Sequence, residues 1–348
     1  MLKFAYVSVL FYFDSEQYAL YYCLIVWYIV PDKWVKTMTM KYISIKEASE
    51  KWGISERRIR ILCSEGRIPE AKKEGKSWQV PENADKPLDA RAYRGVTIGT
   101  NYKNRIAEID RKLNMLKTID NLTKAEKERL REEFVVQYTY DSNAIEGSTV
   151  TLQETALILD GVTIDQKPLK EHLDAIGHKE AYDYIEQLVI ENAPLDSFII
   201  KQIHSLVLAH RPEYRGKYRD IAVHITGTDF ETSDPLHISE DIDSLLAEYK
   251  KNKKAHLIEK VARFHRRFEK IHPFIDGNGR TGRLLLNFEL MKTGYPAINI
   301  KYRDRNRYFQ AFASLEMMTE LIIDCLNESL DKRIGVVLQK QKILEQRK

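Results

Sequence analysis

The sequence predicts a mostly α-helical protein, in which a small domain of two short helices and a β-hairpin precedes a large helical region. Three observations favour this fold class. Apolar residues recur at helical spacing from Tyr102 to the end of the chain. Capping and turn residues mark two short helices and a hairpin between residues 41 and 82. The length of 348 residues suits about two domains, each with a core of its own.

The composition favours a soluble globular protein. Hydrophobic residues make up 43% of the chain and charged residues 30%. The net charge of +4 is too small to mark the whole chain as a polyanion binder. Cys23, Cys63 and Cys325 lie far apart without a CxxC pair, which argues against a disulfide framework and a cysteine-built zinc site. We therefore expect a cytoplasmic protein without a membrane partner.

Residues 1–40 differ in composition from the rest of the chain, because they are hydrophobic and rich in aromatic residues. The longest uncharged stretch, Gln17 to Pro31, falls short of the roughly 20 apolar residues that span a bilayer. A signal-peptide pattern is not clear either. Met38 and Met40 open a segment of ordinary composition, so we expect a non-native or upstream-extended N-terminus. The alternatives are a membrane-associating tail and a strand or helix packed on the body.

The first short helix of the small domain has start and stop signals of its own. Ser44 can cap it, and Glu47, three residues later, completes a capping box. Ala48 and Trp52 fall on one face of this helix. Gly53 supplies the left-handed turn that ends it.

A second helix follows, with Ser55 as its cap and Gly66 at its end. We expect an apolar inner face made of Ile59, Leu62 and Cys63, and an outer face that carries Arg57, Arg58 and Arg60. The segment 72–81 then predicts a two-stranded wing that turns at Gly75.

Two short helices, a tight turn and a basic wing resemble the winged helix-turn-helix of MerR and excisionase proteins. In that architecture the second helix lies in the major groove and the wing contacts phosphates. The resemblance implies DNA contacts from Arg57, Arg58, Arg60, Lys72, Lys73 and Lys76. One module alone would bind DNA weakly, so this function also requires dimerisation. The alternative is a module for protein contacts or dimerisation whose arginines are solvated.

The large region begins after a linker at residues 83–101, and we place its domain at residues 102–338. The apolar period predicts helices at 103–117, 122–140, 151–160, 169–191, 196–209, 239–252, 256–271, 279–293, 304–318 and 319–338. The run from Tyr218 to Gly227 breaks this pattern with β-favouring residues. It predicts a small hairpin or extended flap.

The stretch HPFIDGNGRTGR, from His272 to Arg283, carries the most chemical information. The helix before it stops at His272, because Pro273 disfavours the helical conformation in the residue that precedes it. Gly277 and Gly279 free the backbone for an anion-cradling turn at the start of the next helix, where unpaired N–H groups favour phosphate.

The side chains of the same stretch suit nucleotide chemistry. Arg280 and Arg283 are three residues apart, so both can project from one helix face toward the same polyphosphate. Asp276 offers a hard carboxylate oxygen to Mg²⁺. His272 can take a proton from an attacking hydroxyl.

Residues 272–283 match the signature of the Fic family, HPF-x-[D/E]-GNGR-x-x-R, at every defined position. The chain resembles Fic proteins over about residues 102–330. The resemblance implies a Fic-type helical core with a β-hairpin flap. It also implies transfer of AMP from ATP to a Ser, Thr or Tyr hydroxyl of a protein, with release of pyrophosphate.

The resemblance further implies a role for each residue of the motif. His272 would be the general base, and Asp276 would bind Mg²⁺. The anion hole and the contacts to the β- and γ-phosphates would come from Gly277, Asn278, Gly279, Arg280 and Arg283. Family members that phosphorylate carry Lys at the position of Gly279, which disfavours phosphotransfer here.

Two further segments resemble Fic elements outside this motif. The first resembles the flap that pairs with an extended target segment, and it consists of Val223, His224, Ile225, Thr226 and Gly227. An ordinary surface hairpin is the alternative. The second lies where the family contacts adenosine, and it consists of Arg303, Asn306 and Tyr308. Core packing is the alternative for this helix start.

Ser142 to Gly147 resembles the inhibitory motif of Fic proteins, [S/T]-x-x-x-E-[G/N]. The resemblance implies an inhibitory helix at about residues 141–147, which we expect to follow a helix that ends at Tyr140. Glu146 can pair bidentately with Arg283 and withdraw it from the γ-phosphate of ATP. The alternative is a segment that caps the helix near Thr151, with Glu146 solvated. In the family this architecture is linked to homodimers that control the inhibition and, in some members, to removal of AMP.

Two hypotheses about function follow. The first is a protein adenylyltransferase that is inhibited through Glu146 and Arg283, uses ATP and Mg²⁺, and also modifies itself or removes AMP. The alternative is a DNA-binding transcriptional regulator whose Fic core senses nucleotide or modifies its own chain.

Overall fold

The computed structural model describes residues 41–64, 68, 71–75, 77–82, 84, 101–223 and 232–346. The chain divides into two compact units, Met1–Asp89 and Ala90–Lys348, and each is described by itself. Several predictions lie outside the described residues, namely those for 1–40, Gly66, Lys76, most of the linker, and the flap residues 224–227.

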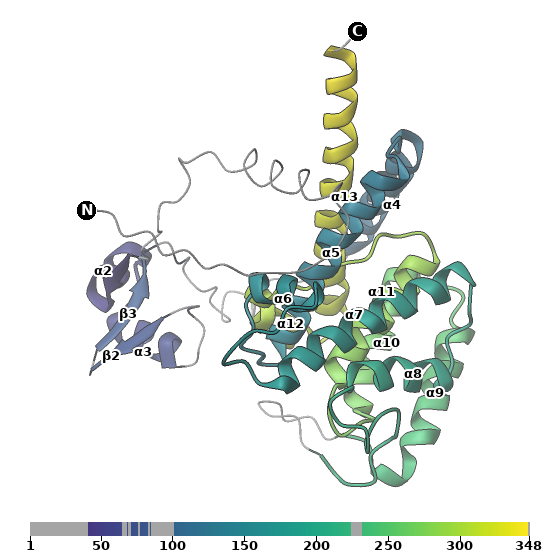
Figure 1. Cartoon of the computed structure of the whole chain (residues 1–348), viewed down its shortest axis with the longest axis horizontal. Helices are drawn as coiled ribbons and strands as arrows, with labels where there is room; N and C mark the ends of the chain where they lie inside the picture. The colour runs from purple at the N-terminus through teal and green to yellow at the C-terminus, as the bar shows by residue number, and fades with distance from the viewer. Residues whose placement is uncertain are drawn as a thin grey trace, which may run out of the picture. The chain divides into compact units, whose positions relative to one another are not determined.

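The small unit combines two helices with a three-stranded antiparallel sheet (Figure 1). Its elements are β1 (Tyr42–Ser44), α2 (Ile45–Trp52), α3 (Glu56–Ser64), β2 (Lys72–Glu74) and β3 (Ser77–Pro81), with strand order β1-β3-β2. The sequence predicts a wing of two strands, which are β2 and β3, but it does not predict the third strand, β1. Three residues are too few for a strand period, and pairing with β3 decides their conformation.

The predicted signals of the first short helix are present, and at the start of the second helix Ser55 Oγ accepts a hydrogen bond from Arg58 N at 3.3 Å. Ser44 Oγ accepts a hydrogen bond from Glu47 N at 3.2 Å, and Ser44 N donates to Glu47 Oε2 at 2.7 Å. Gly53 ends α2 in the left-handed conformation with φ 64°. The apolar faces of α2, α3 and β3 share one core that includes Ala48, Trp52, Ile59, Leu62, Cys63 and Val80.

The large unit is helical in its described part. Its helices are α4 (Asn101–Ile119), α5 (Lys124–Ile145), α6 (Leu152–Leu159), α7 (Leu169–Ile190), α8 (Ser197–Val207), α9 (Ile238–Lys251), α10 (Leu257–Ile271), α11 (Asn278–Lys292), α12 (Arg305–Ala311) and α13 (Leu315–Gln346), with short 3₁₀ turns η2 (Pro235–His237) and η3 (Tyr302–Asp304). The mostly α fold class is confirmed.

Three predicted helix ends are wrong. The helix expected to stop at Tyr140 continues to Ile145, because its polar residues find partners in the interior. Asp141 accepts a hydrogen bond from Tyr302 N at 2.8 Å, and Asn143 donates to Thr139 O at 3.0 Å.

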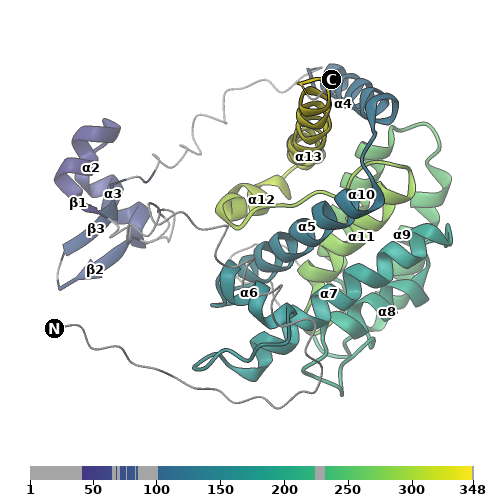
Figure 2. The same cartoon turned by 45° about the horizontal axis from the view of Figure 1, so that its top comes forward.

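The last two helices also divide earlier than expected, between Ala311 and Leu315 rather than after residue 318. Ser314 Oγ accepts from Met317 N at 3.1 Å and so caps α13. The final helix continues to Gln346, beyond the expected end at residue 338, and α4 packs along it (Figures 1 and 2).

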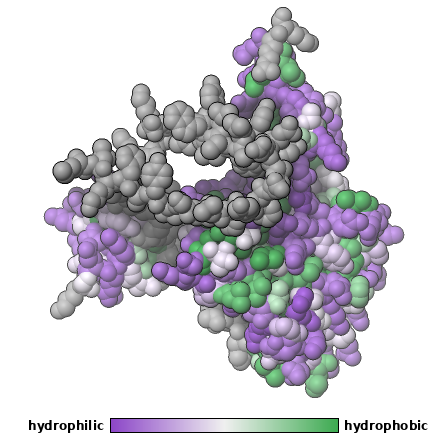
Figure 3. All heavy atoms as spheres, viewed as in Figure 1, coloured by the Kyte–Doolittle hydropathy of each residue, from purple (hydrophilic) through white to green (hydrophobic). Residues whose placement is uncertain are grey.

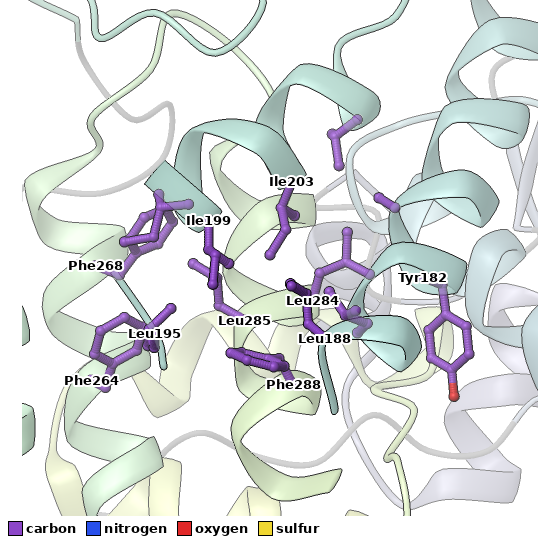
Figure 4. Packing of buried hydrophobic residues seen from close by; sticks show 14 of the residues in the cluster. Tyr182, Leu188, Leu195, Ile199, Ile203, Phe264, Phe268, Leu284, Leu285 and Phe288 are labelled. Atoms are coloured by element: carbon purple, nitrogen blue, oxygen red, sulfur yellow. The ribbon is translucent and has the colours of Figure 1, made fainter. Parts of the chain in front are cut away.

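Helices α10 and α11 lie between two halves of the core. One half joins α10 and α11 to α7 and α8, and Figure 4 shows Phe264, Phe268, Leu285, Phe288 and Ile203 among its side chains. The other half packs the opposite faces of α10 and α11 against α4, α12 and α13. Because both helices are held on two sides, the loop that joins them has a rigid frame.

The exterior of the large unit is mainly polar on the face that Figure 3 shows, with apolar side chains in scattered groups. Leu236, Ile190 and Leu169 are the most exposed of the large apolar residues that the structure describes. Within the described residues, we find no helix with the length and apolar character needed to cross a membrane.

Candidate active site

The loop between α10 and α11 begins at His272 in a conformation that is uncommon for a residue with a side chain. Helix α10 ends at Ile271, and His272 adopts the left-handed conformation with φ 52° and ψ 60°. Pro273 disfavours a further helical residue, so the chain turns here. Residues other than glycine that are held in this region cluster at functional sites.

Arg219 holds this loop from outside the motif. It is 4% exposed, its Nε donates to His272 O at 2.8 Å, and its backbone N donates to Pro273 O at 3.0 Å. Its Nη1 donates to Ile221 O at 2.7 Å, which ties the loop to the segment that leads toward residue 223. Nothing in the local sequence distinguishes Arg219 from a solvated arginine, so no motif pointed to it.

His272 is arranged to act as a neutral base. Its Nδ1 lies 3.3 Å from Glu269 O, a carbonyl that only accepts, so we assign the ring proton to Nδ1 and a lone pair to Nε2. Burial lowers the pKa of the imidazole below its ordinary value, and the hydrogen bond to Glu269 O opposes that effect only in part. The free Nε2 can therefore accept a proton near neutral pH.

The predicted anion cradle lies at the N-terminus of α11. Gly277 precedes the helix with φ 76°, and no side chain caps this end, so the first backbone N–H groups of the helix are available to an anion. The Asn278 side chain takes no part in this donor set. Its Oδ1 accepts from Phe274 N at 2.9 Å and its Nδ2 donates to Phe274 O at 2.8 Å, which closes the loop.

Asp276 carries the partly exposed carboxylate of the loop. Its Oδ1 accepts from Gly277 N at 2.6 Å and lies 3.6 Å from Arg280 Nη2. Burial alone would raise the pKa of this carboxyl, but the charge of Arg280 and the hydrogen bond from Gly277 outweigh it and keep the pKa below its ordinary value. Asp276 is therefore ionised at neutral pH.

The donor set fits Mg²⁺ only if phosphates complete it. The described residues contain no group of three or more His, Cys, Asp or Glu that could hold a metal ion by itself. Mg²⁺ commonly uses one or two carboxylates together with substrate phosphates and water. A lone ionised Asp276 beside an anion cradle suits that shared mode.

Arg280 is buried and already paired. Its Nη1 lies 2.8 Å from Asp174 Oδ1 of α7, and a longer contact of 3.4 Å reaches Asn143 Oδ1 of α5. The same Asp174 oxygen lies 2.8 Å from His210 Nδ1. Asp174 thus fixes the position of one arginine of the motif. The sequence gives no sign of this contact, because Asp174 lies on another helix, far from the motif along the chain.

Arg283 is buried against the end of α5. Its Nη2 donates to Glu146 Oε1 and to Ser142 O, each at 2.8 Å, and its Nε donates to Ser142 Oγ at 3.1 Å. The structure brings together all three residues that the sequence predicts here. The bidentate pairing with Glu146 is wrong, however, because Ser142 uses the other side of the guanidinium and only one carboxylate oxygen is engaged.

Comparisons with known proteins find the same family that the motif resembles. Residues 194–290, which include the whole loop and α10, match the model of the Fic/DOC family. The chain carries a Fic domain. It is 32% identical over 238 residues to the protein adenylyltransferase Fic of Drosophila willistoni, and 35% identical over 212 residues to that of Nematostella vectensis. These alignments cover 66% and 58% of this chain.

The chain spans about half the length of these curated relatives, 47% and 48%. Among solved structures, a Fic-domain signalling protein from Bacteroides thetaiotaomicron superposes with a TM-score of 0.62 at 26% identity, covering 68% of this chain and 97% of that one. Fic-1 from C. elegans superposes with a TM-score of 0.61 at 24% identity, covering 70% of this chain and 74% of that one, and shows the same fold.

Two of the residues expected at adenosine in this Fic protein lie on its surface and one lies in its core. Arg303 and Asn306 are exposed. Tyr308 is 1% exposed, and its hydroxyl lies 2.9 Å from His265 Nε2. Its ring centre is 5.6 Å from Arg283 Cζ. Tyr308 therefore packs in the core behind Arg283, and a direct adenosine contact stays a prediction.

Two buried polar residues of the Fic core have no signal in the sequence. His204 of α8 stacks on Phe274 with 3.6 Å between ring centres, and burial lowers its pKa to about 4. Glu269 of α10 is buried, and the loss of solvation raises its pKa to about 8, against the opposing effect of Arg283. Each is a single polar residue on an apolar helix face, which a periodic pattern does not single out.

In the small unit, the candidate DNA contacts lie on the surface to different degrees. Arg57 and Arg60 of α3 are exposed and Arg58 is partly exposed, while Arg60 pairs with Glu56 at 2.7 Å. Lys72 and Lys73 are exposed in β2, and Lys72 Nζ lies 4.2 Å from the Tyr42 ring centre. DNA binding stays a prediction.

Proposed function

We propose that this Fic protein transfers AMP from ATP to a Ser, Thr or Tyr hydroxyl of a protein, and that Glu146 holds this activity in check. The observation that carries the proposal is one loop in which a base, an uncapped helix N-terminus and two buried arginines meet. The name protein adenylyltransferase, which the relatives carry, supports the same reaction.

The residues divide the chemistry among them. His272 Nε2 takes the proton of the target hydroxyl, whose oxygen then forms a bond to the α-phosphorus of ATP. The bond between that phosphorus and the α–β bridging oxygen breaks, and pyrophosphate leaves. The N–H groups at the start of α11, with Arg280 and Arg283, offset the negative charge of the β- and γ-phosphates.

A magnesium ion has a place in this proposal beside Asp276. Asp276 would hold it together with the phosphates, and the ion would supply further charge neutralisation. The carboxylate is ionised and free on one side, because Gly277 N and Arg280 engage only its Oδ1.

Inhibition follows from the place that Glu146 takes. Its carboxylate forms an ion pair with the guanidinium of Arg283, the group that we propose binds the γ-phosphate. ATP that enters while this pair is intact lacks one of its two arginine contacts, so its phosphates are not oriented for in-line attack. The Glu146 side chain is 37% exposed, so the pair can open toward solvent without unfolding the core.

Intact-mass spectrometry after incubation with ATP and Mg²⁺ tests the proposal on the protein itself. We expect an AMP-sized adduct to accumulate much faster in Glu146→Gly than in the parent protein, and to be absent when His272→Ala is added. Glu191→Gly is the matched control, because Glu191 is also an exposed glutamate at a helix C-terminus but lies at the end of α7.

The result would contradict the proposal if no variant acquires the adduct, even when a mixture of candidate target proteins is added. Equal labelling of the parent, Glu146→Gly and Glu191→Gly would retain the transfer reaction but reject Glu146 as its inhibitor.

A further inference from the structure

His204 lies directly beneath the phosphate loop, although it is far from the motif in sequence. It sits in the last turn of α8 and is fully buried. Its Nε2 lies 3.0 Å from Asp276 O, and its Nδ1 accepts a hydrogen bond from Gly216 N at 3.0 Å. Its ring is parallel to that of Phe274, the third residue of the loop, with an interplanar angle of 1°.

These contacts determine where the ring carries its proton. A backbone N–H only donates, so the bond from Gly216 N requires a lone pair on Nδ1. Asp276 O only accepts, so the contact at Nε2 requires a proton there. Both contacts are satisfied by one species, the neutral imidazole with its proton on Nε2.

The peptide group between Asp276 and Gly277 is held by hydrogen bonds on both sides. The peptide between Asp276 and Gly277 presents its C=O to His204 and its N–H to Asp276 Oδ1, at 2.6 Å. Gly277 has φ 76° and no side chain, so nothing intrinsic to it prevents this peptide from flipping. A flip would turn the carbonyl oxygen toward the Asp276 carboxylate and remove the hydrogen bond from Gly277 N that orients this carboxylate.

We propose that His204 is a positioning residue, which locks the Asp276–Gly277 peptide in the orientation that receives the phosphates of a nucleotide. The inference rests on the proposed function in one respect, namely that the anion in the cradle is a nucleotide phosphate. Packing adds to the lock, since a Cβ built on Gly277 would lie 3.5 Å from the His204 ring and 3.3 Å from Val207 Cγ1.

Two substitutions separate the contacts of His204. His204→Gln places an amide N–H near the position of Nε2 and so keeps a donor for Asp276 O. His204→Asn places an amide oxygen near the position of Nδ1 and so keeps only the acceptor for Gly216 N. Both lose the stacking on Phe274, so each serves as the control for the other.

Both variants are made in the Glu146→Gly background, and binding of the ATP analogue AMPPNP with Mg²⁺ is measured by calorimetry. We expect His204→Gln to stay within about threefold of its background. We expect His204→Asn to bind about tenfold more weakly, the factor that one lost buried hydrogen bond represents. Amide hydrogen exchange at residues 277–279 should be faster in His204→Asn alone. Equal affinity and equal exchange in the two variants would overturn the proposal.

If neither variant folds, the proposal can still be tested on the His204 ring of the parent protein. Two-bond ¹H–¹⁵N spectra of the parent protein should show His204 with its proton on Nε2 throughout the pH range 6–8. A proton on Nδ1 would overturn the proposal. If the background protein does not bind AMPPNP, the proposed function fails, whereas hydrogen exchange and the ring spectrum still decide whether His204 holds the loop.

Discussion

The α-carbon of Gly279 faces the carboxylate of Glu146, which accepts a hydrogen bond from Arg283. A Cβ built on Gly279 would lie 3.1 Å from Glu146 Cδ, 3.1 Å from Arg283 Nη1 and in hard overlap with Glu146 Oε1. A methyl group at position 279 would therefore displace the Glu146 carboxylate from its present place beside Arg283. The glycine thus leaves room for the pair of Glu146 and Arg283, in addition to the freedom that it gives to the backbone of the loop.

This relationship predicts that Gly279→Ala and Glu146→Gly are energetically coupled. In the parent protein, the alanine methyl group displaces the carboxylate and should lower the free energy of unfolding. In the Glu146→Gly background the same change should be neutral or stabilising, because alanine is favoured over glycine in a helix by up to about 1 kcal/mol. Urea unfolding of the four proteins should give a coupling of about 1 kcal/mol or more. Equal effects of alanine in both backgrounds would show that the two residues do not compete for space.

Glu146→Gln should leave the buried charge of Arg283 without its counter-ion. We expect a loss of about 1–2 kcal/mol in the free energy of unfolding, reduced from the cost of a fully buried pair because the Glu146 side chain is partly exposed. ATP with Mg²⁺ should then raise the melting temperature more in Glu146→Gln than in the parent, since its phosphates replace the lost charge. Glu191→Gln is the control. The prediction fails if ATP stabilises the parent at least as strongly as the variant.

The pH dependence of AMP transfer should report the protonation of His272. The base must be neutral to accept a proton, so activity should rise with pH through the pKa of the imidazole and then level off. Burial places that pKa below the ordinary value of 6.5, so the rise in kcat/KM of Glu146→Gly should be complete near neutral pH. A midpoint at or above pH 6.5 would argue against the buried, neutral base.

Buried Glu269 should make the protein less stable as pH rises. Its pKa is raised to about 8 in the folded protein from the ordinary 4.5, so the folded state holds a proton that the unfolded state has lost. The free energy of unfolding should therefore fall between pH 4.5 and 8, and Glu269→Gln should weaken that fall by up to a few kcal/mol. Glu259→Gln, a partly exposed glutamate on the same helix, is the control. Identical pH slopes for the two variants would contradict the assignment.

Local features of this fold were predictable, since each depends on neighbours along the chain. The capping box of Ser44 and Glu47, the turn at Gly53 and the break of α10 before Pro273 are all encoded within a few residues. The ends of α5 and α12 were not predictable in this way. The polar residues near Asp141 favour a helix end in isolation, and hydrogen bonds from other segments, such as that from Tyr302 N, extend the helix.

The reactive groups of the loop can be read from the chain alone, because the histidine, the carboxylate, the glycines and the arginines occupy twelve consecutive residues. The residues that hold them in place become visible only when the helices are packed together. His204 contacts Asp276 across 72 residues, Arg219 contacts His272 across 53, and Glu146 contacts Arg283 across 137. The first two partners are single polar side chains whose meeting depends on how whole helices pack, and such a contact leaves no periodic mark on the chain.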